Sequence, residues 1–445
     1  IWRFLDEDNL AGKLDVKRKY SLSGRAAELK FGGGYTYKER DYQIKGFQFI
    51  PQGVTLSGDP NELFAPENLW PMNGSGTQGT RYEPGFLPNN TNQYNGTVTN
   101  TAMYVSNEFS VSEKFKTILG VRMEGYVQNY TGLNQQGLRL DNVEVLNDLD
   151  FFPSVNLIYS LKEKQNLRLS YSRTVARPSF KEASFAEIFD PLTGRTFIGG
   201  FFKDVDALGN VIRDGDLSAT RINNLDLRWE AFQNRGQMIS FSTFFKSFDN
   251  PIEIIQFIQA PNNFQPRNVG DGKVFGVELE ARQNLDIISN KLDAFSINAN
   301  LTLTESQIRM SETEFTSRLG SARTGETIKN TREMAGQAPY LINVGLTYNQ
   351  IEKGLEAGFY YNVQGETLSY VGVADRPDVY SVPFHSLNFN ANKNIGERMR
   401  VGIGASNLLD AERKLVFKSF GSDDKTFSSL RPGTRISFSF SYNFK

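Results

Sequence analysis

The amino-acid sequence predicts an all-β fold, a transmembrane antiparallel β-barrel, and three observations support this prediction. Stretches in which apolar and polar side chains alternate strictly recur along nearly all of the 445 residues. No apolar run approaches the roughly 18 residues that a membrane-spanning helix needs, and the mean hydropathy is −0.42. Aromatic side chains make up 13% of the chain, which suits a lipid-facing wall with aromatic girdles at both membrane interfaces.

The most regular stretch is the predicted last strand, residues 435–444. Side chains of a strand alternate between two faces, so this segment has one apolar face and one small polar face. Its apolar face comprises Ile436, Phe438, Phe440, Tyr442 and Phe444. The same alternation occurs in residues 225–231, 275–282, 295–303, 355–363 and 399–405, where the charged side chains share the polar face. That face carries too much charge for a dry core, so we expect it to line a wet lumen.

The connections between the predicted strands alternate between short and long. Seven short turns lie near residues 23–27, 111–115, 161–165, 233–236, 288–291, 350–354 and 394–397. Seven long polar segments lie near residues 41–97, 131–148, 177–220, 249–270, 309–336, 371–381 and 409–431. Bacterial outer-membrane barrels keep short turns in the periplasm and long loops outside the cell, so we expect the long segments to be extracellular.

Fourteen connections join fifteen predicted strands, the first at residues 14–21. Single-chain bacterial barrels have an even number of strands, so the odd count predicts the C-terminal part of a larger barrel. An open arc would leave edge backbone groups unpaired in lipid, at a cost of several kcal/mol each, so further N-terminal strands or a partner must close it. The alternatives are an extra strand at residues 252–257 or a smaller, sixteen-stranded barrel.

Charge and residue usage exclude several function classes. The net charge of −1 indicates no nucleic-acid partner, and the lack of cysteine excludes disulfides, Cys-ligated zinc and thiol catalysis. His385 is the only histidine, so it can complete neither a catalytic triad nor a multi-histidine metal site within this chain. We therefore predict no enzyme, no metal centre and no cofactor.

The segment 177–220 is the best candidate for ligand binding. It carries aromatic and basic side chains that a solvated loop would avoid, and folded over the barrel mouth they could hold an amphipathic ligand by stacking and charged hydrogen bonds. The predicted binding residues are Arg177, Phe185, Phe189, Arg195, Phe197, Phe201 and Phe202. The alternative is that these aromatics only pack the loop onto itself and its neighbours, which is the usual role of apolar residues.

Two weaker loop signals accompany this segment. The segment 41–97 contains Trp70, Tyr82, Phe86 and Tyr94 among many Asn and Gly, which only weakly resembles a sugar- or peptide-binding surface. Within residues 202–216, clustered aspartates with a Gly turn could hold calcium, and they comprise Asp204, Asp206, Asp214 and Asp216 with Gly209 and Asn210. The spacing does not match the twelve-residue calcium loop and lacks its closing Glu, so a solvated turn is the favoured interpretation.

Charged side chains on the predicted polar faces are expected to line the lumen. They include Arg122, Glu124, Arg173, Arg228, Glu278, Glu280 and Arg282. In a plugged barrel many of them would pair with the plug or with one another, whereas a porin would use them to set ion selectivity. The sequence alone does not separate these uses.

Several segments are similar to the barrel of TonB-dependent outer-membrane receptors, especially those of Bacteroidetes. They are residues 100–109, 119–124, 152–157, 169–180, 224–230, the Asn407-Leu-Leu-Asp410 motif and Pro432-Gly433-Thr-Arg435. The resemblance covers most of the chain from about residue 97 to the end. The order and spacing of these segments make the set more specific than any one of them.

The resemblance implies a barrel of about 22 strands in the bacterial outer membrane, plugged by an N-terminal domain and energised by the TonB complex. Residues 1–445 would be the barrel part, without the plug, the TonB box and about seven strands. Implied partners are outer-membrane lipid, the plug, TonB, a small or medium nutrient and a surface lipoprotein. The nutrient could be a siderophore, an oligosaccharide or a peptide. A passive porin is the alternative, but it would need a complete, even-stranded barrel without a plug.

Overall fold

The structure is a computed structural model that describes residues 2–71, 76–84, 92–190, 194–205, 208, 211–233, 236–256 and 262–444. Its main sheet joins fifteen antiparallel strands in chain order, and β19 (Thr331–Arg332) adds a short strand beside β18. The fifteen are β1 (Trp2–Leu22), β2 (Arg25–Lys45), β5 (Gln93–Ser110), β6 (Phe115–Leu133), β7 (Arg139–Lys162), β8 (Gln165–Ala176), β13 (Thr220–Phe232), β14 (Met238–Asp249), β17 (Gly272–Asn284), β18 (Phe295–Arg309), β20 (Tyr340–Gln350), β21 (Leu355–Gln364), β24 (Phe384–Ile395), β25 (Met399–Ser406) and β28 (Arg435–Tyr442). The predicted number of wall strands is confirmed.

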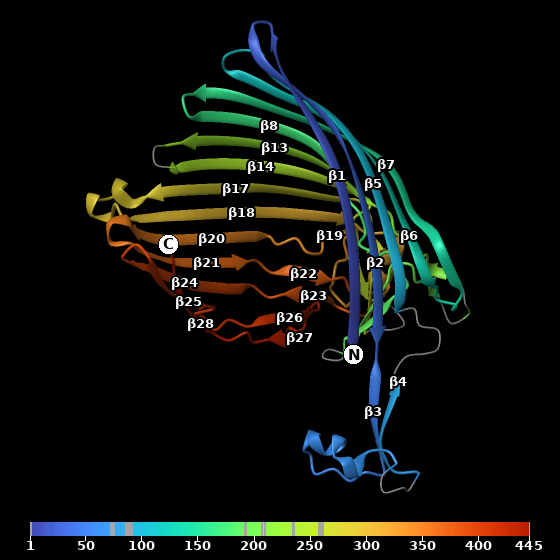
Figure 1. Cartoon of the computed structure of the whole chain (residues 1–445). Helices are drawn as coiled ribbons and strands as arrows, with labels where there is room; N and C mark the ends of the chain where they lie inside the picture. Colours follow the sequence, from blue (N-terminus) through green and yellow to red (C-terminus); the bar gives the residue numbers. More distant parts are fainter. Residues whose placement is uncertain are drawn as a thin grey trace.

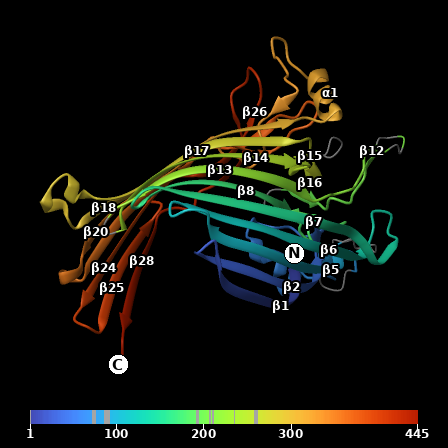
Figure 2. The ribbon, with the colours of Figure 1, turned by 90° about the horizontal axis from the view of Figure 1, so that it is seen from above.

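The main sheet is a curved wall that starts at β1 and ends at β28 (Figures 1 and 2). In the described part of the chain, β1 pairs only with β2 and β28 only with β25. The first strand is longer than the predicted 14–21, because its ladder with β2 runs from Trp2 opposite Lys45 to Leu22 opposite Arg25. The segment 252–257, considered as an extra wall strand, contributes β15 (Ile252–Gln256) to a separate sheet instead, and residue 257 lies outside the described residues.

One face of the wall is apolar and exposed. Met103, Phe438 and Phe440 are 61%, 81% and 67% exposed. So large an apolar surface is typical of a wall that faces lipid, and the strand alternation places most of the charged side chains of the wall's central part on the opposite face. That opposite face is called the lumen face below.

The long connections fold into structures of their own. The first four-stranded sheet contains β9 (Glu187–Asp190), β10 (Arg195–Ile198), β15 (Ile252–Gln256) and β16 (Asn263–Asn268). The second contains β22 (Thr367–Tyr370), β23 (Asp378–Ser381), β26 (Arg413–Lys418) and β27 (Lys425–Leu430). The two sheets meet where the Val371 amide donates to the Ile254 carbonyl and the Gln256 amide donates to the Val371 carbonyl. We call this assembly the cap.

Short elements complete the described chain. The hairpins are β3 (Phe47–Gln52) with β4 (Gly79–Pro84), which projects away from the wall in Figure 1, and β11 (Asp204–Val205) with β12 (Val211–Arg213). The helical elements are α1 (Glu312–Gly320), η1 (Pro60–Phe64), η2 (Pro66–Asn68), η5 (Leu285–Ile287), η6 (Asn290–Leu292) and η7 (Ile351–Lys353). None of these described helices is long and apolar enough to cross a membrane.

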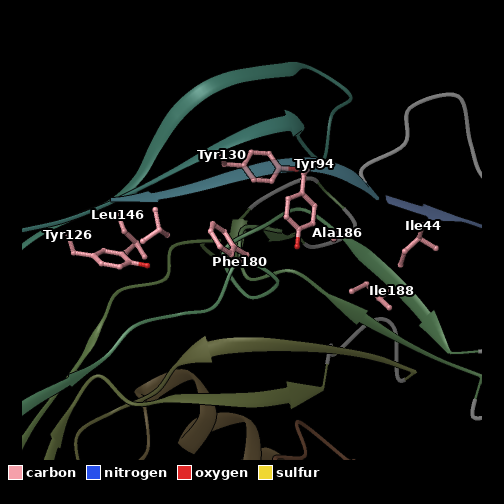
Figure 3. Packing of buried hydrophobic residues seen from close by; sticks show 9 residues of the cluster. Ile44, Tyr94, Tyr126, Tyr130, Leu146, Phe180, Ala186 and Ile188 are labelled. Atoms are coloured by element: carbon pink, nitrogen blue, oxygen red, sulfur yellow. The ribbon is translucent and has the colours of Figure 1, made fainter. Parts of the chain in front are cut away.

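Two apolar clusters attach the long connections to the lumen face. The first joins wall strands to the segment that follows β8, and Figure 3 shows its side chains. It contains Ile44, Tyr94, Val98, Tyr126, Tyr130, Leu146, Phe180, Ala186 and Ile188. The second contains Ile255, Val269, Val274, Ile308, Met334, Leu368, Val371 and Val373. The long connections are therefore folded into the mouth of the barrel, because apolar burial against the wall holds them there.

A glycine makes room for the first cluster. A Cβ atom built on Gly96 of β5 would lie 2.5 Å from Cδ1 of Phe180, closer than real contacts allow. The ring therefore packs directly on the backbone of the strand. The guanidinium of Arg40, which stands opposite Gly96 on β2, has its Cζ 4.9 Å from the Phe180 ring centroid.

Candidate ligand-binding site at the mouth and in the lumen

The lumen face of β6, β7, β8, β13 and β17 carries a network of ion pairs, and we call it the ion-paired wall. Around Glu230 of β13, Arg168 Nε lies 2.6 Å and Arg228 Nε 3.2 Å from the carboxylate oxygens. Arg228 also reaches Glu280 of β17 at 3.1 Å, and Arg282 lies 3.0 Å from the same residue. Five charged side chains from three strands thus compensate one another along the wall.

A second part of this network lies nearer the mouth. Arg122 Nε is 2.7 Å from Glu124, and Glu124 also accepts a bond of 2.9 Å from Arg177. Asp150 lies between Arg177, at 3.3 Å, and Arg221, at 2.8 Å, and Arg221 reaches it from the end of β13 although it has the parity of the outward-facing Leu225. The predicted pairing of lumen charges with one another is therefore present at these positions.

Arg173, expected on the lumen face, lies on the other face of β8. It is in register with Asn223 of β13, and it shares its parity with Leu169 and Tyr171, whereas Arg168 has the opposite parity. The strand is regular here, so alternation alone decides the direction. Glu278 has the same parity as Glu280 and stands opposite Ser242 and Thr302.

The segment after β8 begins with Arg177, which is committed to the wall. In addition to its two carboxylate partners, Arg177 holds its Cζ 4.4 Å from the ring centroid of Tyr126. Its side chain is only 12% exposed. Two carboxylates and an aromatic face compensate the charge of Arg177, so it anchors the segment, although its Nε has no hydrogen-bond partner in the described residues.

Three of the predicted aromatic residues pack together on Tyr130. Phe185 lies 5.8 Å from Tyr130, 5.6 Å from Phe201 and 5.8 Å from Phe202, measured between ring centroids. Phe202 is buried, and the Phe185 and Phe201 side chains are partly buried. In these contacts the aromatic side chains pack the segment onto itself and onto its neighbour β6.

The other predicted residues lie further along the segment. Phe197 stacks beneath Lys181, whose Nζ is 3.7 Å from the ring centroid, and burial lowers the pKa of Lys181. Phe189 of β9 is 46% exposed. Arg195 of β10 reaches the distant β27, where its Nη2 donates to the Phe427 carbonyl at 2.9 Å. The structure thus separates Arg195 and Phe189 from the packed group around Tyr130.

A cavity that we call the mouth cavity lies beside Arg195 and is lined in part by strands of the second cap sheet. Its volume is about 910 Å³. It is lined by Arg195, Asn362, Gln364, Ser381, Val382, Phe384, Arg413, Lys414, Leu415, Phe427, Ser428, Ser429 and Leu430. Strands β10, β21, β23, β24, β26 and β27 all contribute, so the site exists only in the folded mouth. Burial lowers the pKa of Arg195, and this guanidinium still remains protonated at neutral pH.

The lumen cavity lies along β17, β18, β20, β21 and β24 and measures about 490 Å³. Most of its polar lining consists of amides, and we call the lumen face of β18, β20, β21 and β24 the amide wall. The amide residues are Asn298, Asn300, Asn343, Asn362 and Asn388. Asn362 lines both cavities, and its amide donates to Asn343. A polar surface therefore continues from the mouth into the lumen.

A buried ion cluster that joins the cap to α1 and β19 was not predicted from the sequence. Arg332 lies 2.7 Å from both Glu253 of β15 and Glu314 of α1, and its side chain is 8% exposed. Arg318 of α1 adds contacts to Glu314, at 3.3 Å, and to Asp378 of β23, at 2.8 Å. Burial opposes the charged form, but Glu253 and Glu314 raise the pKa of Arg332 above its usual value. The only sequence signal is a set of charges in segments expected to be solvated loops.

The weaker loop signals lie apart from these cavities. Trp70, Tyr82 and Tyr94 are in the described residues, and Phe86 is outside them. In the candidate calcium segment, Asp206, Gly209 and Asn210 are also outside the described residues, while Asp214 pairs with Lys203 at 2.8 Å. The described part of the chain contains no group of three or more His, Cys, Asp or Glu side chains placed to hold a metal ion.

Structural comparison supports the barrel architecture. The ferric citrate transporter FecA in its unliganded form matches with a TM-score of 0.61, 12% identity and coverage of 99% of this chain and 55% of FecA. The copper transporter OprC matches with a TM-score of 0.61, 14% identity and coverage of 99% and 59%. The ferric yersiniabactin uptake receptor FyuA from Yersinia pestis matches with a TM-score of 0.59, 13% identity and coverage of 99% and 55%. The chain thus spans little more than half the length of these proteins.

Sequence comparison identifies the family. No curated protein sequence matches the chain. The family model described as TonB dependent receptor-like, beta-barrel, matches residues 2–408. The fold, the face assignment and this match agree, and the protein is a β-barrel protein of the bacterial outer membrane. The chain belongs to the β-barrel family of TonB-dependent receptors.

Proposed function

We propose that the chain is the barrel part of an active transporter that binds a scarce nutrient at its extracellular mouth and imports it with energy from TonB. The observation that carries this proposal is the polar route from the mouth cavity to the lumen cavity, joined at Asn362, in a barrel of the TonB-dependent receptor family. A ligand held at the mouth would meet the amide wall next. The non-enzymatic nature of the family accords with a transport role.

The proposed whole protein contains more than these residues. Further strands beside β1 and β28 would close the wall, since each of these strands has one edge without a partner in the described residues. A plug domain would fill the lumen, and TonB would act on that plug from the periplasm. A surface lipoprotein is proposed as an additional partner at the mouth. The similar transporters named above act on ferric citrate, ferric yersiniabactin and copper, three chemically different cargoes.

A passive porin is the competing function, and energy dependence separates the two. We would delete the gene in its native bacterium and follow which compounds disappear from the medium. Active transport predicts that one compound is depleted only by the parent strain, and that a protonophore or loss of TonB abolishes its depletion. Depletion that continues without TonB and without the proton gradient would identify a porin, and equal depletion by the deletion strain would reject both.

A further inference from the structure

We propose that the mouth cavity is an anion-binding site that selects a ligand with carboxylate or similar oxyanion groups on an aromatic or apolar body. This inference rests on the proposed transport function and adds the chemical class of its substrate. It is carried by the convergence of two guanidinium groups and two phenyl rings from four separate strands, β10, β24, β26 and β27. These segments are up to about half the chain apart in sequence.

Positive charge dominates the lining of the mouth cavity. Arg195, Arg413 and Lys414 line it, and no lining residue is a carboxylate. Neither guanidinium forms an ion pair with a carboxylate in the part of the chain that the structure describes. A cavity whose arginines form no ion pair in the described residues, and whose lining carries net positive charge, favours a ligand that brings negative charge.

The neighbouring carboxylates do not cancel this charge. Glu412 accepts bonds from Ser429 and from Arg431, whose Nε is 3.4 Å away. Glu366 is paired with Lys418 at 2.6 Å. Asp190 stands opposite Arg195 in the β9–β10 ladder. Even if the charge of Asp190 is added to that of the lining residues, the net charge of the cavity remains positive.

The two arginines are held in place while donors remain for a ligand. Arg195 rests with its Cζ 3.4 Å from the Phe427 ring centroid and uses Nη2 for the Phe427 carbonyl. Arg413 rests with its Cζ 4.9 Å from the Phe384 ring centroid. A guanidinium has five N–H donors, so each arginine keeps donors for a planar oxyanion. The phenyl rings that hold the arginines also offer apolar surface to the ligand body.

The hydroxyl and amide groups of the lining would complete recognition. Ser381, Ser428 and Ser429 supply hydroxyl groups, and Gln364 and Asn362 supply amides. Gln364 Nε2 donates to Thr367 at 3.2 Å, which orients this amide at the cavity wall. The anion would therefore enter at the arginines and leave toward the amide wall through Asn362.

The direct test is binding of matched probes to the full-length receptor in detergent. We would compare benzene-1,3,5-tricarboxylate with its uncharged triamide by titration calorimetry at pH 7. The proposal predicts at least tenfold tighter binding of the tricarboxylate. It also predicts that R195Q/R413Q binds the tricarboxylate at least tenfold more weakly than wild type, because both charged hydrogen-bond donors are lost. Equal binding of the two probes by the wild-type receptor would overturn the proposal.

Control variants separate charge recognition from folding. Arg431→Gln removes one positive charge from the connection that also carries Arg413, but Arg431 lies outside the lining, so this variant should bind the tricarboxylate like wild type. R195K/R413K keeps the charge and should recover part of the affinity. Retention of heat-modifiable migration by each variant would show that the barrel is folded. An equal loss of tricarboxylate affinity in R431Q and R195Q/R413Q would overturn the proposal. The probe would then be attracted by the overall positive potential of the mouth and not by the arginines of the cavity.

The depletion experiment tests the transport proposal and the anion-selection proposal separately. If the depleted nutrient is anionic at pH 7 and R195Q/R413Q no longer removes it, both proposals are supported. If the parent depletes a nutrient by a TonB-dependent route and R195Q/R413Q does so equally well, anion selection fails while transport stands. If the deletion strain depletes the medium like the parent, the transport proposal fails, whatever the probe titration shows.

Discussion

The ion-paired wall and the amide wall are parts of one sheet, yet they satisfy their polar groups in different ways. On the ion-paired wall, Glu124, Asp150 and Glu230 are each held by two arginine side chains, and the wall is partly covered by the segment after β8. On the amide wall, neutral side chains border the lumen cavity. Charged side chains that are fully ion-paired can hold folded loops on the wall. Neutral amides offer hydrogen-bond donors and acceptors to a ligand, and removing water from them costs less than removing it from charges. The first wall is therefore suited to anchoring, and the second, under the transport function proposed above, to ligand passage.

The largest expected effect comes from removing the anchor of the ion-paired wall. Arg177→Ala should destabilise the segment after β8 by about 3–5 kcal/mol, because it leaves Glu124 and Asp150 buried with one fewer cation. Hydrogen–deuterium exchange of residues 177–190 in the lipid-reconstituted receptor measures this change. Arg282→Ala on the same wall is the control, and its 57% exposed side chain should cost less than about 1 kcal/mol. Similar exchange in both variants would contradict the anchoring role.

A smaller effect is expected when the packing of that segment is disturbed without changing charge. Gly96→Ala forces a Cβ against Phe180, so we expect a cost of about 1–3 kcal/mol and faster exchange around Phe180. Gly125→Ala is a matched control in the neighbouring β6, because a Cβ there meets nothing within 4 Å. If the two variants exchange alike, Phe180 does not depend on the glycine.

The amide wall should respond in transport rather than in stability. Asn362→Ala removes an amide at the junction of the two cavities, and losing one hydrogen bond of about 1 kcal/mol predicts roughly fivefold weaker uptake of the nutrient. Thermal unfolding should change little, since Asn362 is not buried. Asn349→Ala, on β20 but outside both cavities, is the control. Unchanged uptake by N362A would place the route elsewhere.

The smallest effect concerns the rim above the amide wall. The hydrogen bond from Ser429, followed by the charge of Arg431, lowers the pKa of Glu412 below 4.5. A lowered pKa stabilises the β26–β27 hairpin above pH 4.5, and this contribution is lost as pH falls through the folded-state pKa. Glu412→Gln should therefore lower the melting temperature slightly at pH 7 and converge with wild type in acid. A difference that persists in acid would show that charge is not the cause.

The sequence alone determined the wall, because a strand pattern with a two-residue period depends only on neighbouring residues. The fifteen strands and the outward face of Phe438 and Phe440 follow from it, and so do the lumen positions of Glu124 and Glu280. The same rule places Arg173 outward, since Leu169 and Tyr171 have its parity, so that error was avoidable from sequence. The resemblance in residues 100–435 also identified the family that the comparison found.

Only the tertiary structure decided how the mouth is built. The cap sheets, the Glu253–Arg332–Glu314 cluster and the meeting of Arg195 with Phe427 join segments far apart in the chain. No local period records such pairings, because side chains in long connections find partners only after the wall has brought the connections together. In the sequence, a charged residue that stays in solvent looks the same as one that is buried in an ion pair. The physical difference between them is burial, which exists only in the folded molecule.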